Sequence, residues 1–328
     1  MVKEDLLRDL YNRRGYDKKA SDDAVGYVVD MANFLISSNK TFETSGPGEI
    51  EAYMQVLIKK KINTLPVILA LARYFYLIDN HSGYIYFTKI LGGLGVIDNI
   101  KKRLRSHTDE ATLDFIFKDL EEPPLGSRPS EKPDFTANLM ERLKAHLEPD
   151  VYKKVLAGNN HGIPKEAMYS EKEEYEKATS LDEYLESRHK RKVAELQDFC
   201  DSKRVWFEQE ITQDIVDYVA ANQEILSAVR EGDSLYVTKI PFDGINYLNT
   251  DDPILKCYYA CHCPFARESI LDEGKENVDA EWCYCSAGFA KFPFEVILDT
   301  ELDIEMLQSP LKGDHVCRFR ISLPSGIK

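Results

Sequence analysis

Apolar side chains recur at helical spacing through the first part of the chain. Over residues 21–38 they follow one another at intervals of three or four, which is typical of an amphipathic helix, and Ser21 is a suitable N-terminal cap. Similar patterns predict helices at 49–61, 64–79 and 83–91. The chain is therefore expected to begin with a helical bundle, which we assign to residues 1–120.

A proline-rich stretch follows and predicts a domain boundary. Residues 121–134 hold Pro123, Pro124, Pro129 and Pro133. Proline removes a backbone donor and disfavours a regular helix, so this stretch is expected to be an exposed linker. Helical patterns then return over residues 136–199, and an alternating pattern predicts a strand at 234–240.

The second domain is expected to cover residues 135–328. Its segment 254–263 is rich in β-forming residues and ends at a proline, which predicts a strand with Cys257, Tyr259, Cys261 and Cys263 on one face. A helix is expected to open at Cys283, and a last strand at 315–319. The predicted fold class is α+β, with an N-terminal helical bundle followed by helices and a C-terminal α/β ligand-binding domain.

The charge is uneven and narrows the class of partner. The formal net charge is +1 over residues 1–120 and −15 over the remainder of the 328 residues. An acidic body repels nucleic-acid phosphates, which argues against a nucleic-acid partner. The most apolar stretch, 65–77, falls short of the roughly 20 residues that cross a bilayer, and the first residues do not resemble a signal peptide. We expect a cytoplasmic protein with no membrane partner, and the sequence leaves a homo-oligomer open.

The cysteines are the main candidates for chemistry. Six of the seven lie between Cys257 and Cys317, and in a reducing compartment they are expected to be free thiols. Three interpretations compete. Four of them could bind zinc, since zinc takes four thiolate or imidazole ligands: Cys261, Cys263, Cys283 and Cys285.

The second interpretation is a catalytic thiol. One of those four cysteines would attack a carbonyl or amidine-like carbon, with His262 or His315 as the base and Arg267 as a further group that lowers the thiol pKa. In the third interpretation the cysteines fill the core, which we expect for Cys200, Cys257 and Cys317.

The C-terminal part resembles an uncharacterised bacterial family related to the aminothiazoline-carboxylate hydrolases and, more distantly, to 4-vinyl-reductase-type ligand-binding domains. The resemblance is carried by Cys261-His-Cys-Pro-Phe-Ala-Arg-Glu268, Trp282-Cys-Tyr-Cys-Ser-Ala-Gly-Phe289, Leu311-Lys-Gly-Asp314 and Cys317-Arg-Phe319. It implies an α/β domain with a pocket for a small organic molecule, lined by the two cysteine pairs and Cys317. In the first domain, residues 49–75 resemble the helical core-binding domain of tyrosine recombinases, which implies a helical fold.

Further site residues are expected around this pocket. We place Tyr259, Arg267, Tyr284 and Cys317 among the ligand contacts. Where the resemblance implies a cysteine-bearing loop, this chain reads Asn159-Asn160-His161, so His161 is the candidate metal ligand from that loop.

Three functions follow as expectations. The first is a small-molecule-binding or sensor protein with a cysteine-rich pocket that could hold zinc. The alternative is a thiol- or metal-dependent hydrolase of a small C–N bond substrate, and a DNA-associated regulator has the least support. The sequence does not decide whether the protein is an enzyme.

Overall fold

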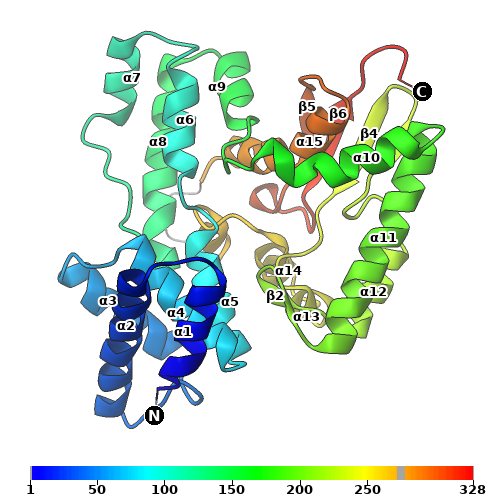
Figure 1. Cartoon of the computed structure of the whole chain (residues 1–328). Coiled ribbons are helices and arrows are strands. Elements are labelled where there is room, and N and C mark those ends of the chain that lie inside the picture. Colours follow the sequence, from blue (N-terminus) through cyan, green and yellow to red (C-terminus); the bar gives the residue numbers. More distant parts are fainter. Residues whose placement is uncertain (1, 272–277, 328) are drawn as a thin grey trace. The chain divides into compact units, whose positions relative to one another are not determined.

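The computed structural model of the chain describes residues 2–271 and 278–327 (Figure 1). The chain divides into two compact units. The first unit comprises Met1–Gly92 and Pro123–Arg128, and the second comprises Gly93–Glu122 and Pro129–Lys328. Each unit is considered by itself below.

The first unit is a helical bundle. Its helices are α1 (Glu4–Arg13), α2 (Lys18–Ser37), α3 (Pro47–Lys59), α4 (Leu65–Leu77) and α5 (His81–Leu91). The Asp17 carboxylate accepts the Ala20 N–H at the start of α2, so this cap lies four residues before the predicted Ser21. The bundle encloses one hydrophobic core, which includes Met31, Ile50, Leu71 and Phe75. The predicted helical N-terminal part is confirmed.

The segment Pro123–Arg128 closes this bundle. Asn63 donates its Nδ2 to the Leu125 carbonyl at 2.8 Å, and Leu125 packs against the bundle core. Gly126 has φ +88°, and a Cβ there would lie 2.1 Å from the Met54 methyl group. The stretch expected to be an exposed linker thus contributes contacts to the first unit, while Gly93–Glu122 packs with the second.

The second unit combines helices with two small antiparallel sheets. Its helices are α6 (Val96–Leu104), α7 (Glu110–Phe117), α8 (Lys132–His146), α9 (Pro149–Leu156), α10 (Tyr169–Lys177), α11 (Leu181–Ser202), α12 (Gln213–Ala220), α13 (Gly244–Leu248), α14 (Pro253–Ala260) and α15 (Tyr284–Ile297). Short 3-10 turns are η1 (Pro129–Glu131), η2 (Lys165–Met168), η3 (Arg267–Ile270), η4 (Ala280–Cys283) and η5 (Pro310–Lys312). The strands are β1 (Val205–Trp206), β2 (Gln209–Glu210), β3 (Val229–Glu231), β4 (Ser234–Thr238), β5 (Ile304–Gln308) and β6 (Arg318–Ser322).

The larger sheet has the strand order β3-β4-β6-β5, with every neighbouring pair antiparallel. Helix α15 packs against β5 and β6, as Figure 1 shows. The alternation of strand side chains directs Leu235, Phe319 and Ile321 into the core that α15 covers. The α+β fold class is confirmed.

One predicted strand is a helix. Residues 253–260 form α14, and the Cys261 N–H bonds to the Cys257 carbonyl at 3.2 Å. Asp252 accepts the backbone N–H groups of Ile254 and Leu255, and Pro253 occupies the first turn, where its missing N–H costs nothing. This N-terminal signal outweighs the β-forming residues that follow. The expectation that Cys257, Tyr259, Cys261 and Cys263 share one strand face is therefore wrong.

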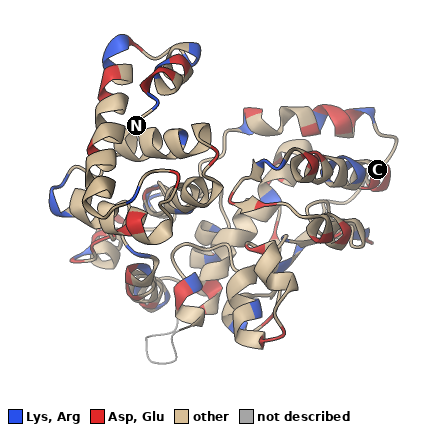
Figure 2. Cartoon of the chain, turned by 90° about the horizontal axis from the view of Figure 1, so that it is seen from below, with Lys and Arg blue, Asp and Glu red and all other residues tan. Residues whose placement is uncertain are grey.

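Figure 2 shows acidic and basic residues interspersed along the helices. Over residues 2–271 and 278–327, no helix combines the length and the apolar character needed to cross a membrane.

Candidate functional site

Five cysteines of the second unit lie close enough that each affects the pKa of at least one other, and they form what we call the thiol cluster: Cys261, Cys263, Cys283, Cys285 and Cys317. All five are free thiols. They come from three segments: the chain after α14, the junction of η4 and α15, and the residue before β6. Cys263 and Cys285 pack with one hydrophobic core of the unit, and Cys283 and Cys317 pack with another. The cluster therefore lies where two cores meet.

Two of these thiols accept hydrogen bonds from neighbouring side chains. The Trp282 indole N–H donates to Cys263 Sγ at 3.1 Å, and the Ser309 hydroxyl donates to Cys283 Sγ at 3.0 Å. Both donors are fully buried. These bonds hold the sulfur atoms in defined positions inside the unit.

The His161 loop reaches the same cluster. His161 Nε2 lies 3.9 Å from Cys285 Sγ, and the His161 ring meets the Phe289 ring edge-on at 5.3 Å. Asn160 is fully buried, and its Nδ2 donates to the carbonyls of Val155 and Leu156 at the end of α9. The loop singled out from the sequence is thus beside the second cysteine pair.

Burial sets the protonation state of the thiols. Burial raises the pKa of Cys285 and of Cys317 to about 12 each, and neighbouring sulfurs add to the effect. The pKa values of Cys261, Cys263 and Cys283 are also raised, first by burial. At neutral pH the cluster therefore consists of protonated thiols, because desolvation disfavours the thiolate.

Charged and aromatic side chains border the cluster. His262 Nε2 lies 2.6 Å from the Ile240 carbonyl, and burial followed by the Lys239 charge holds the pKa of His262 well below its ordinary value. Arg267 lies over the rings of Phe242 and Tyr258, at 4.3 and 4.9 Å from their centroids.

Lys239 approaches the cluster from the end of β4. Its ammonium donates to the Ser286 hydroxyl at 3.2 Å and lies 4.9 Å from the centroid of the Phe289 ring. Its backbone N–H donates to the Cys317 carbonyl at 3.0 Å. Two cationic side chains, Lys239 and Arg267, thus flank the thiols.

Other residues expected at the site lie at its edge or outside it. Tyr259 and Tyr284 are partly buried, with the Tyr259 ring against Tyr258 and the Tyr284 ring under the Lys153 ammonium. His315 is exposed, so it does not share the buried environment of the thiols. Cys257 is buried within α14, and Cys200 is partly buried near the end of α11.

The thiol cluster offers the donor atoms that zinc prefers. In the conformation described, however, no three His, Cys, Asp or Glu side chains of residues 2–271 and 278–327 converge as a metal site requires. Two of the sulfur atoms instead face Trp282 and Ser309. As the side chains stand, the cluster does not form a four-ligand centre.

Four residues of the site were not among those predicted from the sequence. Trp282 and Ser309 bond the sulfurs, Asn160 anchors the His161 loop, and Lys239 supplies a charge. Trp282 adjoins a cysteine pair and Asn160 adjoins His161, which were usable signals. Nothing near Lys239 or Ser309 in the sequence connects either residue with the cysteines.

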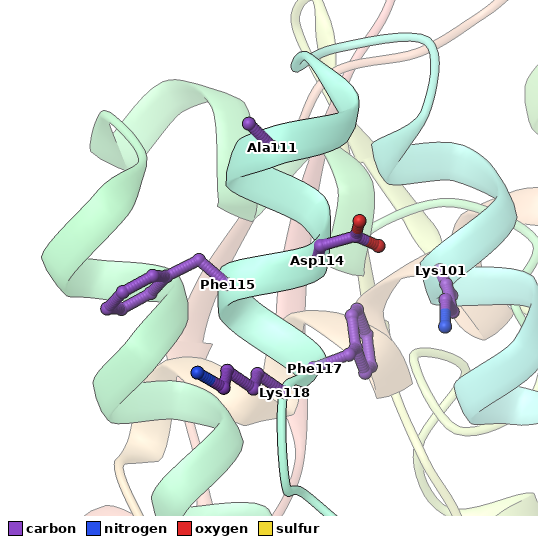
Figure 3. Close-up of a pocket in the computed structure, with 6 residues that line it drawn as sticks. All are labelled: Lys101, Ala111, Asp114, Phe115, Phe117 and Lys118. Atoms are coloured by element: carbon purple, nitrogen blue, oxygen red, sulfur yellow. The ribbon is translucent and has the colours of Figure 1, made fainter.

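A separate depression lies at the surface of the second unit, beside α7 (Figure 3). It has a volume of about 470 Å³ and is lined by Lys101, Ala111, Asp114, Phe115, Phe117 and Lys118. Phe115 and Phe117 project from different sides of α7, and Lys101 lies over the Phe117 ring. The thiol cluster shares no residue with this depression.

The fold and the site define an α+β protein with a buried cluster of reduced thiols. Residues 243–328 match a family described as a family of unknown function (DUF6144). The matched region contains all five cluster cysteines but lies after His161 and Lys239. No curated protein and no solved structure gives a significant match to the chain.

Proposed function

We propose that this chain is a small-molecule-binding or sensor protein whose ligand site is the thiol cluster. The observation that carries the proposal is the convergence of five free thiols and the His161 ring from segments far apart in the sequence. Hydrogen bonds from Trp282 and Ser309 fix two of the sulfur atoms.

The protonation states favour binding over nucleophilic catalysis. A catalytic cysteine works as a thiolate in a partly exposed, electropositive setting. Here burial raises the pKa of every cluster thiol, and the pKa of His262 is lowered while its Nε2 lies against a backbone carbonyl. His315, the other expected base, is exposed. These features support a recognition site in preference to a hydrolase.

Zinc is the second ligand that we propose for the cluster. The observation that favours it is the approach of His161 Nε2 to Cys285 Sγ, since imidazole and thiolate are preferred zinc ligands. Binding would require Cys261, Cys263 or Cys283 side chains to turn toward that pair and to lose their protons. When bound, zinc would crosslink the chain after α14, the junction of η4 and α15, and the His161 loop.

The test is a joint measurement of bound metal and thiol reactivity. The protein would be purified without a histidine tag, under reducing and chelator-free conditions, as wild type and as Cys200→Ser. The substitution removes the one cysteine that lies outside the last quarter of the chain. Metal content per chain and the rate of alkylation would then be measured before and after denaturation.

The outcomes separate the candidates. Near-stoichiometric zinc, released together with the cluster thiols, would support the metal-binding form of the proposal. Absence of metal, with slow alkylation of the native cluster, would contradict the metal-binding form and the hydrolase, and would agree equally with cysteines that fill the core. Rapid alkylation of one cluster thiol at neutral pH in Cys200→Ser would contradict the proposal and favour the hydrolase.

A further inference from the structure

We propose that copies of this chain associate head to tail, with Phe207 of one copy inserted into the depression beside α7 of the next. Phe207 lies at the tip of the hairpin formed by β1 and β2, and the depression is lined by Phe115, Phe117, Lys101 and Lys118 among others. Neither surface includes a residue of the thiol cluster. The inference therefore goes beyond the proposed function and does not depend on it.

The hairpin presents an aromatic ring to solvent on a fixed base. Phe207 is 72% exposed, and it is the first residue of a two-residue loop closed by the pair Trp206 and Gln209. The Phe207 ring meets the Trp206 ring edge-on, with 4.7 Å between the centroids. Trp206 is buried, and its indole N–H donates to the Glu195 carboxylate at 2.9 Å. The position of the exposed ring is thus set by a buried neighbour.

The backbone of Phe207 is strained. Its φ is +51°, in the left-handed region that favours glycine. Two-residue hairpin loops usually place glycine, asparagine or aspartate in that region, and a bulky residue there is an outlier. Strained residues of this kind gather at binding sites. Folding of the turn does not require the phenyl group, so we assign it a role in binding.

The depression beside α7 is suited to receive a phenyl ring (Figure 3). Its volume of about 470 Å³ is that of a small-ligand pocket, which exceeds what one phenyl ring needs. Phe115 is 58% exposed, and aromatic rings attract one another edge to face. Phe207 does not line the depression of its own chain, and Trp206 packs with a different hydrophobic core from Phe117. The ring that fills the depression therefore comes from a second copy.

The charges of the two surfaces are complementary. The depression holds Lys101, Lys118 and one aspartate, a formal charge of +1. Residues 198–210 around the hairpin hold two basic and four acidic side chains, a formal charge of −2. Glu208 and Glu210 lie next to the tip, and Glu210 is exposed. Opposite charges of this kind steer one surface onto the other and fix their register.

The form of the assembly follows from the geometry. Because the hairpin and the depression are different surfaces, their contact is heterologous, and its repetition gives a ring or an open filament. One aromatic anchor and a few charges are less than a stable interface contains. The association should therefore be weak, increase with protein concentration and decrease with added salt. A nucleic acid or an anionic membrane is a poor alternative partner, because the chain carries a formal net charge of −14.

The first test is sedimentation velocity of the full chain over a series of protein concentrations, at low and at physiological salt. Phe207→Gly should weaken self-association by about tenfold or more, as loss of an aromatic anchor predicts. It should not lower the thermal unfolding midpoint, because glycine relieves the strained φ and offsets the lost contact with Trp206. The matched control is Tyr169→Ala, which removes another exposed aromatic side chain of the same unit and should leave association unchanged.

A mixing experiment tests the head-to-tail geometry. The double variant Phe115→Ala with Lys118→Glu keeps the hairpin and damages the depression, whereas Phe207→Gly keeps the depression and removes the anchor. Each variant alone should remain monomeric. An equimolar mixture should form a dimer that does not grow further, because only one intact hairpin and one intact depression can meet. A symmetric contact between two hairpins would not be restored by mixing.

Three results would overturn the inference. The first is a wild-type sedimentation coefficient that does not rise with concentration, and the second is equal association of the wild type and Phe207→Gly. The third is a mixture of the two variants that stays monomeric. If the wild type remained monomeric and bound anionic lipid vesicles through Phe207, the hairpin would have a lipid partner and the proposed assembly would be wrong.

Discussion

Gly288 of α15 and Gly158 after α9 are in direct backbone contact. A Cβ added at Gly288 would lie 2.3 Å from the Gly158 carbonyl oxygen and 2.6 Å from the Ala157 carbonyl carbon. No side chain fits in that space. Because Cys285 and Phe289 lie within one turn of Gly288, this contact also brings the His161 loop to the thiol cluster.

The first prediction concerns that contact. Gly288→Ala should lower the free energy of unfolding by about 1–3 kcal/mol, because backbone atoms must move to admit the methyl group. The control is Gly26→Ala in α2, where nothing lies within 4 Å of the added Cβ. There alanine should raise stability by up to about 1 kcal/mol. Urea unfolding followed by circular dichroism compares the two, and equal effects would contradict the proposed packing role.

The second prediction concerns Glu281, which precedes the second cysteine pair. Its carboxylate accepts hydrogen bonds from Tyr152 at 2.6 Å and pairs with Lys153 at 2.7 Å and with Lys144 at 3.2 Å. Although burial opposes ionisation, these donors lower the pKa of Glu281 to about 2.

The pKa of Glu281 is lower in the folded state than in the unfolded state, so ionisation of this carboxyl stabilises the fold. This contribution should be fully present at neutral pH and should be lost as the pH falls from about 5 toward 2. Glu281→Gln should cost on the order of 1–3 kcal/mol at pH 7 and much less near pH 2. Urea midpoints over this pH range give the test, with the exposed Glu166→Gln as control. A cost independent of pH would exclude the electrostatic explanation.

The third prediction concerns the order in which thiols react. Cys200 and Cys263 are partly buried, whereas Cys261, Cys283, Cys285 and Cys317 are buried. The Cys263 sulfur accepts the Trp282 N–H, and burial raises the pKa of the Cys263 thiol. Alkylation of the native protein at pH 7 should therefore modify Cys200 first, and Cys200→Ser should remove the fast phase. Mass spectrometry of quenched samples gives the order. Early modification of Cys283 would contradict it.

The fourth prediction concerns the residue that follows Cys317. Arg318 donates two hydrogen bonds of 2.7 Å to Glu224, which also accepts the Thr238 hydroxyl. Arg318→Lys keeps the charge but cannot form both bonds, so it should cost about 1–2 kcal/mol. Arg320→Lys, two residues along β6 with a 45% exposed side chain, should change stability by less than about 0.5 kcal/mol. If Arg318→Lys and Arg320→Lys lowered the free energy of unfolding in urea equally, the two hydrogen bonds from Arg318 to Glu224 would not contribute to stability.

The helices were predictable where local signals agree. Helices α3 and α4 carry proline in their first turn, and α5 is capped by Asn80, so their positions follow from residues close in the sequence. The same kind of signal, Asp252 with Pro253, precedes α14. There the capping residues favour a helix while the residues after them favour a strand, and the helix forms.

The candidate site depends on contacts between residues far apart in the sequence, which patterns of neighbouring residues cannot predict. The spacing of the two cysteine pairs marks them as a group, but only the fold brings Cys317 to them and places His161 beside Cys285, which is 124 positions away. A family resemblance indicated the His161 loop as part of the site. No feature of the sequence indicated Lys239, because a lysine that follows a strand is usually a solvated surface residue.

The order in which the chain contributes segments to its two units affects when the first unit can fold during synthesis. The bundle of α1 to α5 is completed by Pro123–Arg128, which leaves the ribosome only after Gly93–Glu122 of the second unit. A fragment that stops at Gly92 lacks the Leu125 carbonyl that Asn63 bonds and the Gly126 backbone that meets Met54. Since domains usually fold in the order of their synthesis, the first unit here must wait for part of the second to be translated before it can be closed.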